Sequence, residues 1–252
     1  MSRQDSVNKK SSPMKNPICV ALDVDDRDQA LRLADDLADI VGGFKLGPRL
    51  CLRYGQSFIR EVVARGPVFV DCKFFDIPST MVASVKACRE AGASLVTVHA
   101  TAGAEGLKAL ADLENEINAA GVHQGATPFR ILAVSILTSW QESSLPSSFK
   151  PQNLNQHVID LAQDVVRSGL KGLVCSAHEL KDLQFLMESK NLYAVTPGIR
   201  LSLGETHDQK RVMGPKEALD EGASLLVVGR PILEAKNPKL AATDFVLSAY
   251  EN

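Results

Sequence analysis

The sequence has few cysteines, and they are not arranged as a disulfide framework or a zinc site would require. There are five in 252 residues, an odd number, and no two of them form a Cys-x-x-Cys pair. Three lie in apolar runs, where a free thiol behaves as a small hydrophobic side chain. The five are Cys19, Cys51, Cys72, Cys88 and Cys175. This pattern argues against both kinds of site and indicates a reducing, cytoplasmic setting.

The sequence also lacks a strong net charge and a long hydrophobic run. Its net charge is −2, which gives no basic field for nucleic acid or an anionic membrane. No apolar stretch approaches the roughly 18 residues that span a bilayer. Residues 1–16 are polar and lack the apolar core of a secretory signal, so we expect a disordered tail there. We therefore predict that neither nucleic acid nor a membrane is a partner.

Two ligand-binding motifs are absent as well. Gly103 and Gly106 do not complete the Gly-x-Gly-x-x-Gly pattern of dinucleotide-binding folds. Asp23, Asp25 and Asp26 lack the spacing and the glycine of a calcium loop, and Asp25 or Asp26 is expected to cap the helix that follows. No metal site is therefore predicted.

Short β-rich runs alternate along the chain with longer segments of helical period. Strands are predicted at 18–23, 43–46, 68–73, 95–99, 131–137, 172–175, 192–196 and 225–228. Helices are predicted at 27–41, 48–65, 78–91 and 104–120. Strands joined through helices pair in parallel, and eight such units favour a closed (β/α)8 TIM barrel over residues 17–252, with its active site at the C-terminal ends of the strands. Periodicity alone leaves an open doubly wound sheet possible.

A weak internal repeat supports this division. Glu90-Ala-Gly-Ala-Ser-Leu-Val precedes the fourth predicted strand, and Glu221-Gly-Ala-Ser-Leu-Leu precedes the eighth. A looser version, Ser168-Gly-Leu-Lys-Gly-Leu-Val, leads into the sixth. In each copy we expect a glycine to end a helix just before an apolar strand begins.

The segment Asp71-Cys-Lys-Phe-Phe-Asp-Ile-Pro-Ser-Thr80 carries the strongest functional signal. Alternate side chains of a strand share a face, so Asp71 and Lys73 should project together and Cys72 away from them. Asp76 should follow on the loop, and Pro78 suits the first turn of a helix. Charges at the end of a buried strand are costly unless they pair or do chemistry. A purely structural ion pair is the alternative interpretation.

Polar residues recur at the ends of the predicted strands, where a barrel gathers its catalytic groups. They are Asp23, Lys45, Asp71 with Lys73, His99, Thr138, Arg200 and Arg230. No second histidine or cysteine stands at ligand spacing from His99, which favours a structural role for that residue.

The decapeptide at 71–80 closely resembles the Asp-x-Lys-x-x-Asp-Ile-Pro signature of the orotidine 5′-phosphate decarboxylase family. The resemblance extends in order through Ala21-Leu-Asp23, Phe44-Lys45, Leu137-Thr-Ser139, Val174-Cys-Ser-Ala177, Thr196-Pro-Gly-Ile-Arg200, Asp208-Gln-Lys-Arg211 and Val228-Gly-Arg-Pro231. It implies a barrel that converts orotidine monophosphate to UMP and CO2 in pyrimidine biosynthesis without a cofactor, as a homodimer. The chain departs from the family pattern at Cys72, Phe75 and Ser79.

The resemblance also implies roles for particular residues. Lys73 would protonate the ring carbanion, and Lys45, Asp71 and Asp76 would complete an alternating charged array, with Asp76 reaching the neighbouring subunit's site. The implied substrate contacts are Asp23 with the ribose, Thr138 with the base, Arg200, Gln209, Gly229 and Arg230 with the ring and phosphate, and in addition Lys45, Asp71 and Thr80. A helix starting at Pro231 would further favour a phosphate. The segment between Arg200 and Lys210 is expected to close over the phosphate.

Two alternatives stay open at this point. A related barrel enzyme, such as a hexulose-phosphate synthase or a keto-gulonate-phosphate decarboxylase, uses the same Asp-x-Lys-x-x-Asp residues to hold Mg²⁺. A catalytically silent nucleotide-binding barrel is the other, against which the intact Lys73 and both aspartates argue.

Overall fold

The apolar runs of the sequence form the strands of one closed parallel barrel in the computed structural model, which describes residues 14–122, 128–201 and 213–250. The side chains of residues 121 and 122 are not described. The strands are β1 (Ile18–Ala21), β2 (Gly43–Leu46), β3 (Val68–Phe74), β4 (Leu95–His99), β5 (Arg130–Val134), β6 (Gly172–Val174), β7 (Tyr193–Pro197) and β8 (Leu225–Val228). They pair in sequence order, and β1 closes the barrel against β8. The predicted (β/α)8 barrel is confirmed, and the open sheet is excluded.

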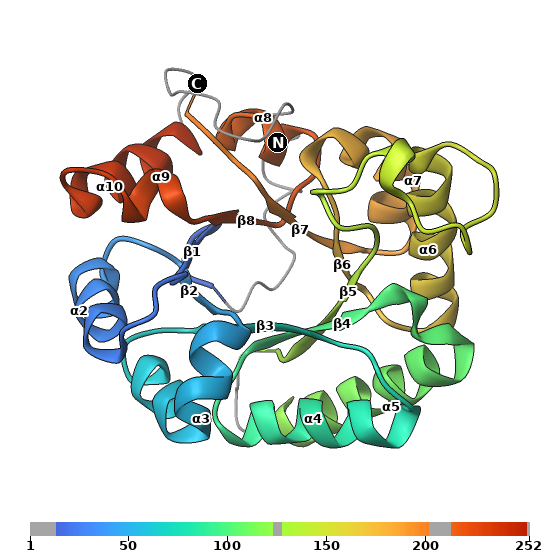
Figure 1. Ribbon diagram of the computed structural model, residues 1–252, viewed down its shortest axis with the longest axis horizontal. Coiled ribbons are helices and arrows are strands. Elements are labelled where there is room, and N and C mark those ends of the chain that lie inside the picture. Colours follow the sequence, from blue (N-terminus) through green and yellow to red (C-terminus); the bar gives the residue numbers. More distant parts are fainter. Residues whose placement is uncertain (1–13, 123–127, 202–212, 251–252) are drawn as a thin grey trace.

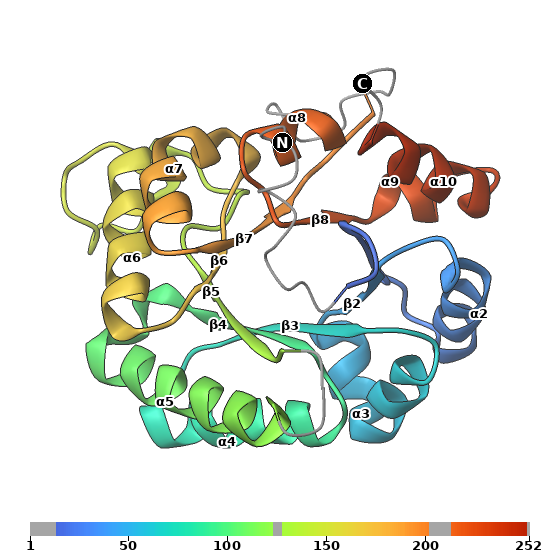
Figure 2. The same cartoon turned by 180° about the vertical axis from the view of Figure 1, so that it is seen from behind.

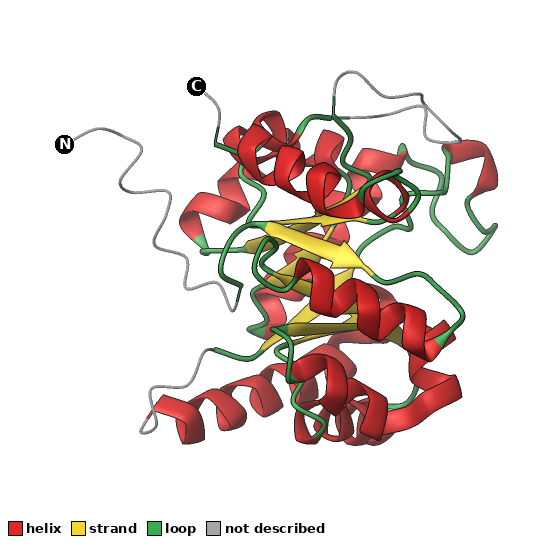
Figure 3. Ribbon diagram, turned by 90° about the vertical axis from the view of Figure 1, so that its left-hand side faces the viewer, coloured by secondary structure: helices red, strands yellow, loops and turns green. Residues whose placement is uncertain are grey.

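Helices follow the strands and form a ring around the barrel, as Figure 1 and the reverse view in Figure 2 show. They are α2 (Arg27–Leu37), α3 (Pro48–Val63), α4 (Pro78–Glu90), α5 (Gly103–Val122), α6 (Leu154–Ser168), α7 (Leu180–Ser189), α8 (Pro215–Asp220), α9 (Arg230–Leu233) and α10 (Pro238–Ser248). Figure 3 shows the strands from the side, enclosed by the helices. The predicted strands at 43–46, 95–99 and 225–228 agree with β2, β4 and β8 residue for residue.

Several helices begin at residues whose chemistry suits a helix start. The Asp26 carboxylate accepts a hydrogen bond from the backbone N–H of Gln29 at 2.7 Å, as expected for the cap of α2. Pro78 occupies the first position of α4, as predicted, where its missing N–H costs nothing.

The repeated glycines end helices as the sequence predicted. Gly92, Gly169 and Gly222 have φ of 98°, 98° and 103°, in the left-handed region that other residues enter only at a cost. Each lies just beyond its helix and directs the chain back toward the next strand.

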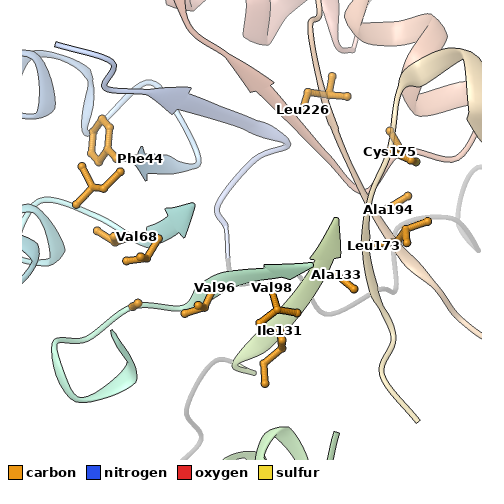
Figure 4. Close-up of a cluster of buried hydrophobic side chains, with 14 of the residues drawn as sticks. Phe44, Val68, Val96, Val98, Ile131, Ala133, Leu173, Cys175, Ala194 and Leu226 are labelled. Atoms are coloured by element: carbon orange, nitrogen blue, oxygen red, sulfur yellow. The ribbon is translucent and has the colours of Figure 1, made fainter. Parts of the chain in front are cut away.

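Most strands contribute to two separate cores. Outward side chains such as Val96 and Val98 pack under the helices, in the cluster drawn in Figure 4. Inward side chains such as Phe69, Leu95 and Tyr193 fill the barrel together with Met14, which is 6% exposed. The lower barrel is therefore a packed core, which leaves the carboxyl ends of the strands as the place for a cavity.

Met14 lies inside the segment that we expected to be a tail, and residues 1–13 lie outside the described part of the chain. The division at residue 16 stays a prediction. No helix among the described residues is long and apolar enough to cross a membrane.

Candidate active site

A cavity of about 290 Å³ opens where the strands end. Most of the predicted site residues line it, although they come from strands far apart in the sequence. They are Asp23, Lys45, Asp71, Lys73, Thr138, Arg200, Gly229 and Arg230. Apolar side chains of the inward core, including Phe69, Val195 and Val227, form the rest of its wall. Charged and apolar side chains thus line one pocket, which is the usual composition of a site for a small molecule.

Four charges of alternating sign run in series along one side of the cavity. Lys45 Nζ lies 3.2 Å from Oδ1 of Asp23 and 3.4 Å from Oδ2 of Asp71. The other Asp71 oxygen, Oδ1, accepts a hydrogen bond from Lys73 Nζ at 2.8 Å. The side chains of Lys45 and Asp71 are only 11% and 13% exposed, whereas that of Lys73 is 37% exposed. Lys73 is therefore the ammonium that a ligand in the cavity can reach.

The array keeps its buried members charged. Burial alone would raise the pKa of the Asp71 carboxyl, but Lys45 and Lys73 outweigh it and hold that pKa below its ordinary value. Burial opposes the charged form of Lys45, but Asp71 and Asp23 raise the pKa of its ammonium above the usual range. Each charge is stabilised by its neighbours of opposite sign.

Strand β3 positions two of these charges by alternation. Asp71 and Lys73 face the cavity, and Cys72 packs against the outer core, as predicted. The pairing of β3 with β4 shifts register between Val70 and Phe74, and Lys73 has φ of 49°. This bulge turns the end of the strand so that Lys73 reaches back to Asp71.

The sequence did not single out Thr97, although it contacts both members of the pair. Its hydroxyl accepts a hydrogen bond from the Lys73 backbone N–H at 2.9 Å and donates one to Asp71 Oδ1 at 3.0 Å. The signal that could have found it is a polar residue at an inward position of a buried strand.

A second region of the cavity is positively charged. Arg200, beyond β7, and Arg230, at the end of β8, both line it. Burial and then the charge of Arg230 lower the pKa of the Arg200 guanidinium. Two neighbouring cations that repel each other favour an anionic ligand, and a phosphate can accept hydrogen bonds from both. The helix expected at Pro231 is the single turn α9, which starts at Arg230 and is too short to add a substantial dipole.

His99 does not line the cavity. Its Nδ1 lies 2.7 Å from Oγ1 of Thr101, and its ring meets that of Phe75 edge-on at 5.9 Å. Burial and then the charge of Lys73 lower the pKa of the imidazole, which favours its neutral form. These contacts agree with the structural role favoured from the sequence.

Two predicted residues, Asp76 and Thr80, do not line the cavity, and a third lies outside the described residues. Asp76 is exposed on the loop after β3, and its Oδ1 accepts a hydrogen bond from the Ile77 N–H at 2.6 Å. Thr80 is exposed in the first turn of α4 and does not line the cavity. Gln209 lies outside the described residues, as does most of the expected lid between Arg200 and Lys210.

The fold and the site together define a class: a (β/α)8-barrel enzyme with an Asp–Lys–Asp–Lys array and a positively charged region at the carboxyl ends of its strands. A sequence model of the Orotidine 5'-phosphate decarboxylase / HUMPS family matches residues 16–245. The chain belongs to this family, which confirms the resemblance found in the sequence.

Individual relatives agree with this assignment over nearly the whole chain. The orotidine 5'-phosphate decarboxylase of Carboxydothermus hydrogenoformans is 38% identical over 92% of this chain and 95% of its own. The protein of that name from Parasynechococcus marenigrum is 41% identical over 89% and 90%, respectively. The crystal structure of orotidine 5'-phosphate decarboxylase from Lactobacillus acidophilus superimposes with a TM-score of 0.78 at 30% identity, covering 94% of this chain and all of that one.

Proposed function

We propose that this protein is an orotidine 5′-phosphate decarboxylase that converts orotidine monophosphate to UMP and CO2 without a cofactor. The observation that carries the proposal is the Asp23–Lys45–Asp71–Lys73 array, with an ammonium facing the cavity. Loss of CO2 breaks a carbon–carbon bond and leaves its electron pair on a ring carbon, in the plane of the ring. With no cofactor to take up those electrons, the protein must stabilise the carbanion electrostatically and protonate it.

Lys73 is the proposed proton donor. Its ammonium stabilises the developing carbanion, transfers a proton to the ring carbon, and regains one from solvent after release of UMP. Asp71 holds the ammonium from one side at 2.8 Å. The packed wall of Phe69, Val195 and Val227 limits water near the reacting carbon, which strengthens these interactions.

Different parts of the cavity are proposed to bind different parts of the substrate. Asp23 is proposed to contact the ribose and Thr138 the base, and Lys45 and Asp71 join the contacts around the reacting ring. Arg200 and Arg230, with Gly229 and Gln209, are proposed to hold the ring and the phosphate. Binding energy from the phosphate can then be used to align the ring with Lys73.

We further propose a homodimer in which Asp76 and Thr80 serve the partner's site. Asp76 is exposed between Phe75 and Ile77, which are 65% and 63% exposed. Large apolar side chains on both sides of an exposed carboxylate suit a protein interface better than open solvent. The five free thiols suit a reducing cytoplasm.

The family also includes the HUMPS branch, so a Mg²⁺-dependent reaction on a sugar phosphate is the competing function. The donor set argues for the decarboxylase: both oxygens of Asp71 already face lysine ammoniums, which compete with a metal ion. Among the described residues, no group of three or more His, Cys, Asp or Glu side chains is placed to hold a metal.

The deciding experiment follows the loss of orotidine monophosphate absorbance with EDTA present. We expect full turnover under these conditions. Activity that vanishes with the chelator and returns with Mg²⁺ would favour the competing function. Lys73→Ala should lose roughly 100- to 10,000-fold in kcat while still binding UMP. The matched control is Lys108→Ala, which removes an exposed ammonium paired with Asp112 on α5. Near-normal turnover in Lys73→Ala would exclude Lys73 as the proton donor.

A further inference from the structure

The backbone pairing between β3 and β4 is interrupted beside the Asp71–Lys73 pair. Val70 pairs with Val96 and Phe74 with Val98, so four steps along β3 match two along β4. Within this bulge Lys73 has φ of 49°, a left-handed conformation that a lysine adopts only when its surroundings hold it. Something other than the regular strand pairing must therefore fix the Lys73 backbone.

Thr97 supplies that contact. It is fully buried on β4, and its neighbours Val96 and Val98 point to the outer core seen in Figure 4. Its side chain points the other way, to the Lys73 backbone N–H at 2.9 Å and to Asp71 Oδ1 at 3.0 Å. Because the hydroxyl accepts from Lys73, its own hydrogen is free to be donated to Asp71. A single hydroxyl thus connects the backbone of one charged residue to the carboxylate of the other.

We infer that Thr97 is a positioning residue for the decarboxylation: it fixes the strained Lys73 backbone and the Asp71 carboxylate relative to each other, so that the Lys73 ammonium faces the cavity. The inference rests on the proposed function. It follows from the two hydrogen bonds that the hydroxyl makes at this position. Valine has the same shape but neither donor nor acceptor, whereas serine keeps both.

The electrostatics around Asp71 give the inference a second, independent readout. Asp71 is faced by Lys45 from β2, by Lys73 from its own strand and by the thiol of Cys19 from β1. Asp23 is linked to Asp71 through Lys45, which contacts both carboxylates, and His99 on β4 lies near Lys73. The Thr97 hydroxyl adds to the two lysines in lowering the pKa of Asp71. Its removal should raise that pKa, because one stabilising hydrogen bond to the charged form is lost.

The test compares Thr97→Val with Thr97→Ser. In Thr97→Val we expect kcat to fall roughly 10- to 100-fold, since Lys73 and Asp71 lose their shared anchor, with a smaller change in KM. Thr97→Ser should recover most of kcat. The Asp71 carboxyl, observed by ¹³C NMR and assigned with Asp71→Asn, should titrate at higher pH in Thr97→Val than in the wild type.

Thr196→Val is the matched control. Thr196 is equally buried, on β7, but its hydroxyl has no hydrogen-bond partner among the described residues and does not line the cavity. The same substitution there should leave kcat, KM and the Asp71 titration unchanged.

Three results would overturn the inference: kcat of Thr97→Val within twofold of the wild type, an unchanged Asp71 titration, or a serine variant as impaired as the valine variant. The titration of the Asp71 carboxyl can be measured without catalytic turnover. A wild-type protein that fails to decarboxylate orotidine monophosphate would refute the proposed function, whereas an unshifted Asp71 carboxyl in Thr97→Val would refute the role of Thr97.

Discussion

Lys45, on β2, places its ammonium 3.4 Å from the carboxylate of Asp71, on the neighbouring strand β3, and both side chains are nearly buried. A buried ion pair contributes little over a well-packed apolar pair, but removal of one partner leaves an uncompensated charge. A change in either residue should therefore lower the stability of the protein, whatever the net contribution of the intact pair to folding.

Asp71→Asn should both abolish catalysis and destabilise the protein. Lys45 would keep Asp23 as a partner, so we expect a loss of about 3 kcal/mol in the free energy of unfolding, at the low end for a broken buried pair. Chemical denaturation measures it. Asp112→Asn is the control, because it breaks an exposed pair with Lys108 and should cost less than about 1 kcal/mol. Equal losses in the two variants would contradict the idea that Asp71 neutralises buried charge.

The fold was largely predictable because a buried parallel strand needs a short apolar run, and those runs stand out in this sequence. Apart from the helix start expected at Pro231, the helices after the fifth strand were not located. One of them, α8, has only six residues, too few for a helical period to show. The fifth strand was predicted through residue 137 but ends at Val134, because the chain leaves the barrel there and brings Thr138 to the cavity.

The site was predictable where strand alternation alone decides the face to which a side chain points. That rule placed Asp71 and Lys73 on one face and Cys72 on the other. It could not give the left-handed backbone of Lys73, since that conformation arises from the bulge against β4 rather than from residue type. Thr97 was missed because a threonine in an apolar strand is also an ordinary β-former. Only its inward position distinguishes it.

Mixing two inactive variants tests whether Asp76 acts on the partner's site. Lys73→Ala and Asp76→Ala should each be inactive alone. In a mixed dimer with shared sites, one site carries both changes and the other carries neither. Co-refolding equal amounts should therefore restore about a quarter of wild-type activity, since half of the dimers would be mixed and each would hold one intact site.

The same mixture gives no activity if Asp76 acts within its own chain, because every site then keeps one lesion. Sedimentation of the mixture provides the control that dimers form. A monomeric protein with full activity would exclude the shared site altogether.

Arg230 should contribute chiefly to binding the phosphate. Arg230→Ala is expected to weaken UMP binding by about 1.5–3 kcal/mol, the range for a hydrogen bond to a charged group, and to change uridine binding little. Competition assays with both ligands measure the difference. Arg167→Ala, an exposed arginine paired with Asp164 on α6, is the control. An equal loss for UMP and uridine would show that Arg230 does not act through the phosphate.

Glu114, which does not line the cavity, should make the stability of the protein depend on pH. It is 8% exposed on α5, and its Oε2 accepts a hydrogen bond from the Ile131 N–H at 2.5 Å, at the start of β5. Burial raises the pKa of this carboxyl from 4.5 to about 7, against the opposing effects of that hydrogen bond and of Arg130 and Lys171. The folded protein therefore binds the proton more tightly than the unfolded chain does.

Linkage between folding and proton binding at Glu114 gives the direction in which stability changes with pH. The stabilising contribution of protonated Glu114 is complete below pH 4.5 and is lost as the pH rises through about 7. Glu114→Gln keeps an acceptor for Ile131 without a charge, so it should be more stable than the wild type at pH 8, by about 3 kcal/mol, and nearly equal to it at pH 4. Denaturant titrations at the two pH values measure this. Glu116→Gln, exposed on the same helix, should show neither effect. If Glu114→Gln were less stable than the wild type at pH 8, the ionised carboxylate would have to be stabilised by Arg130 and Lys171 more strongly than burial destabilises it.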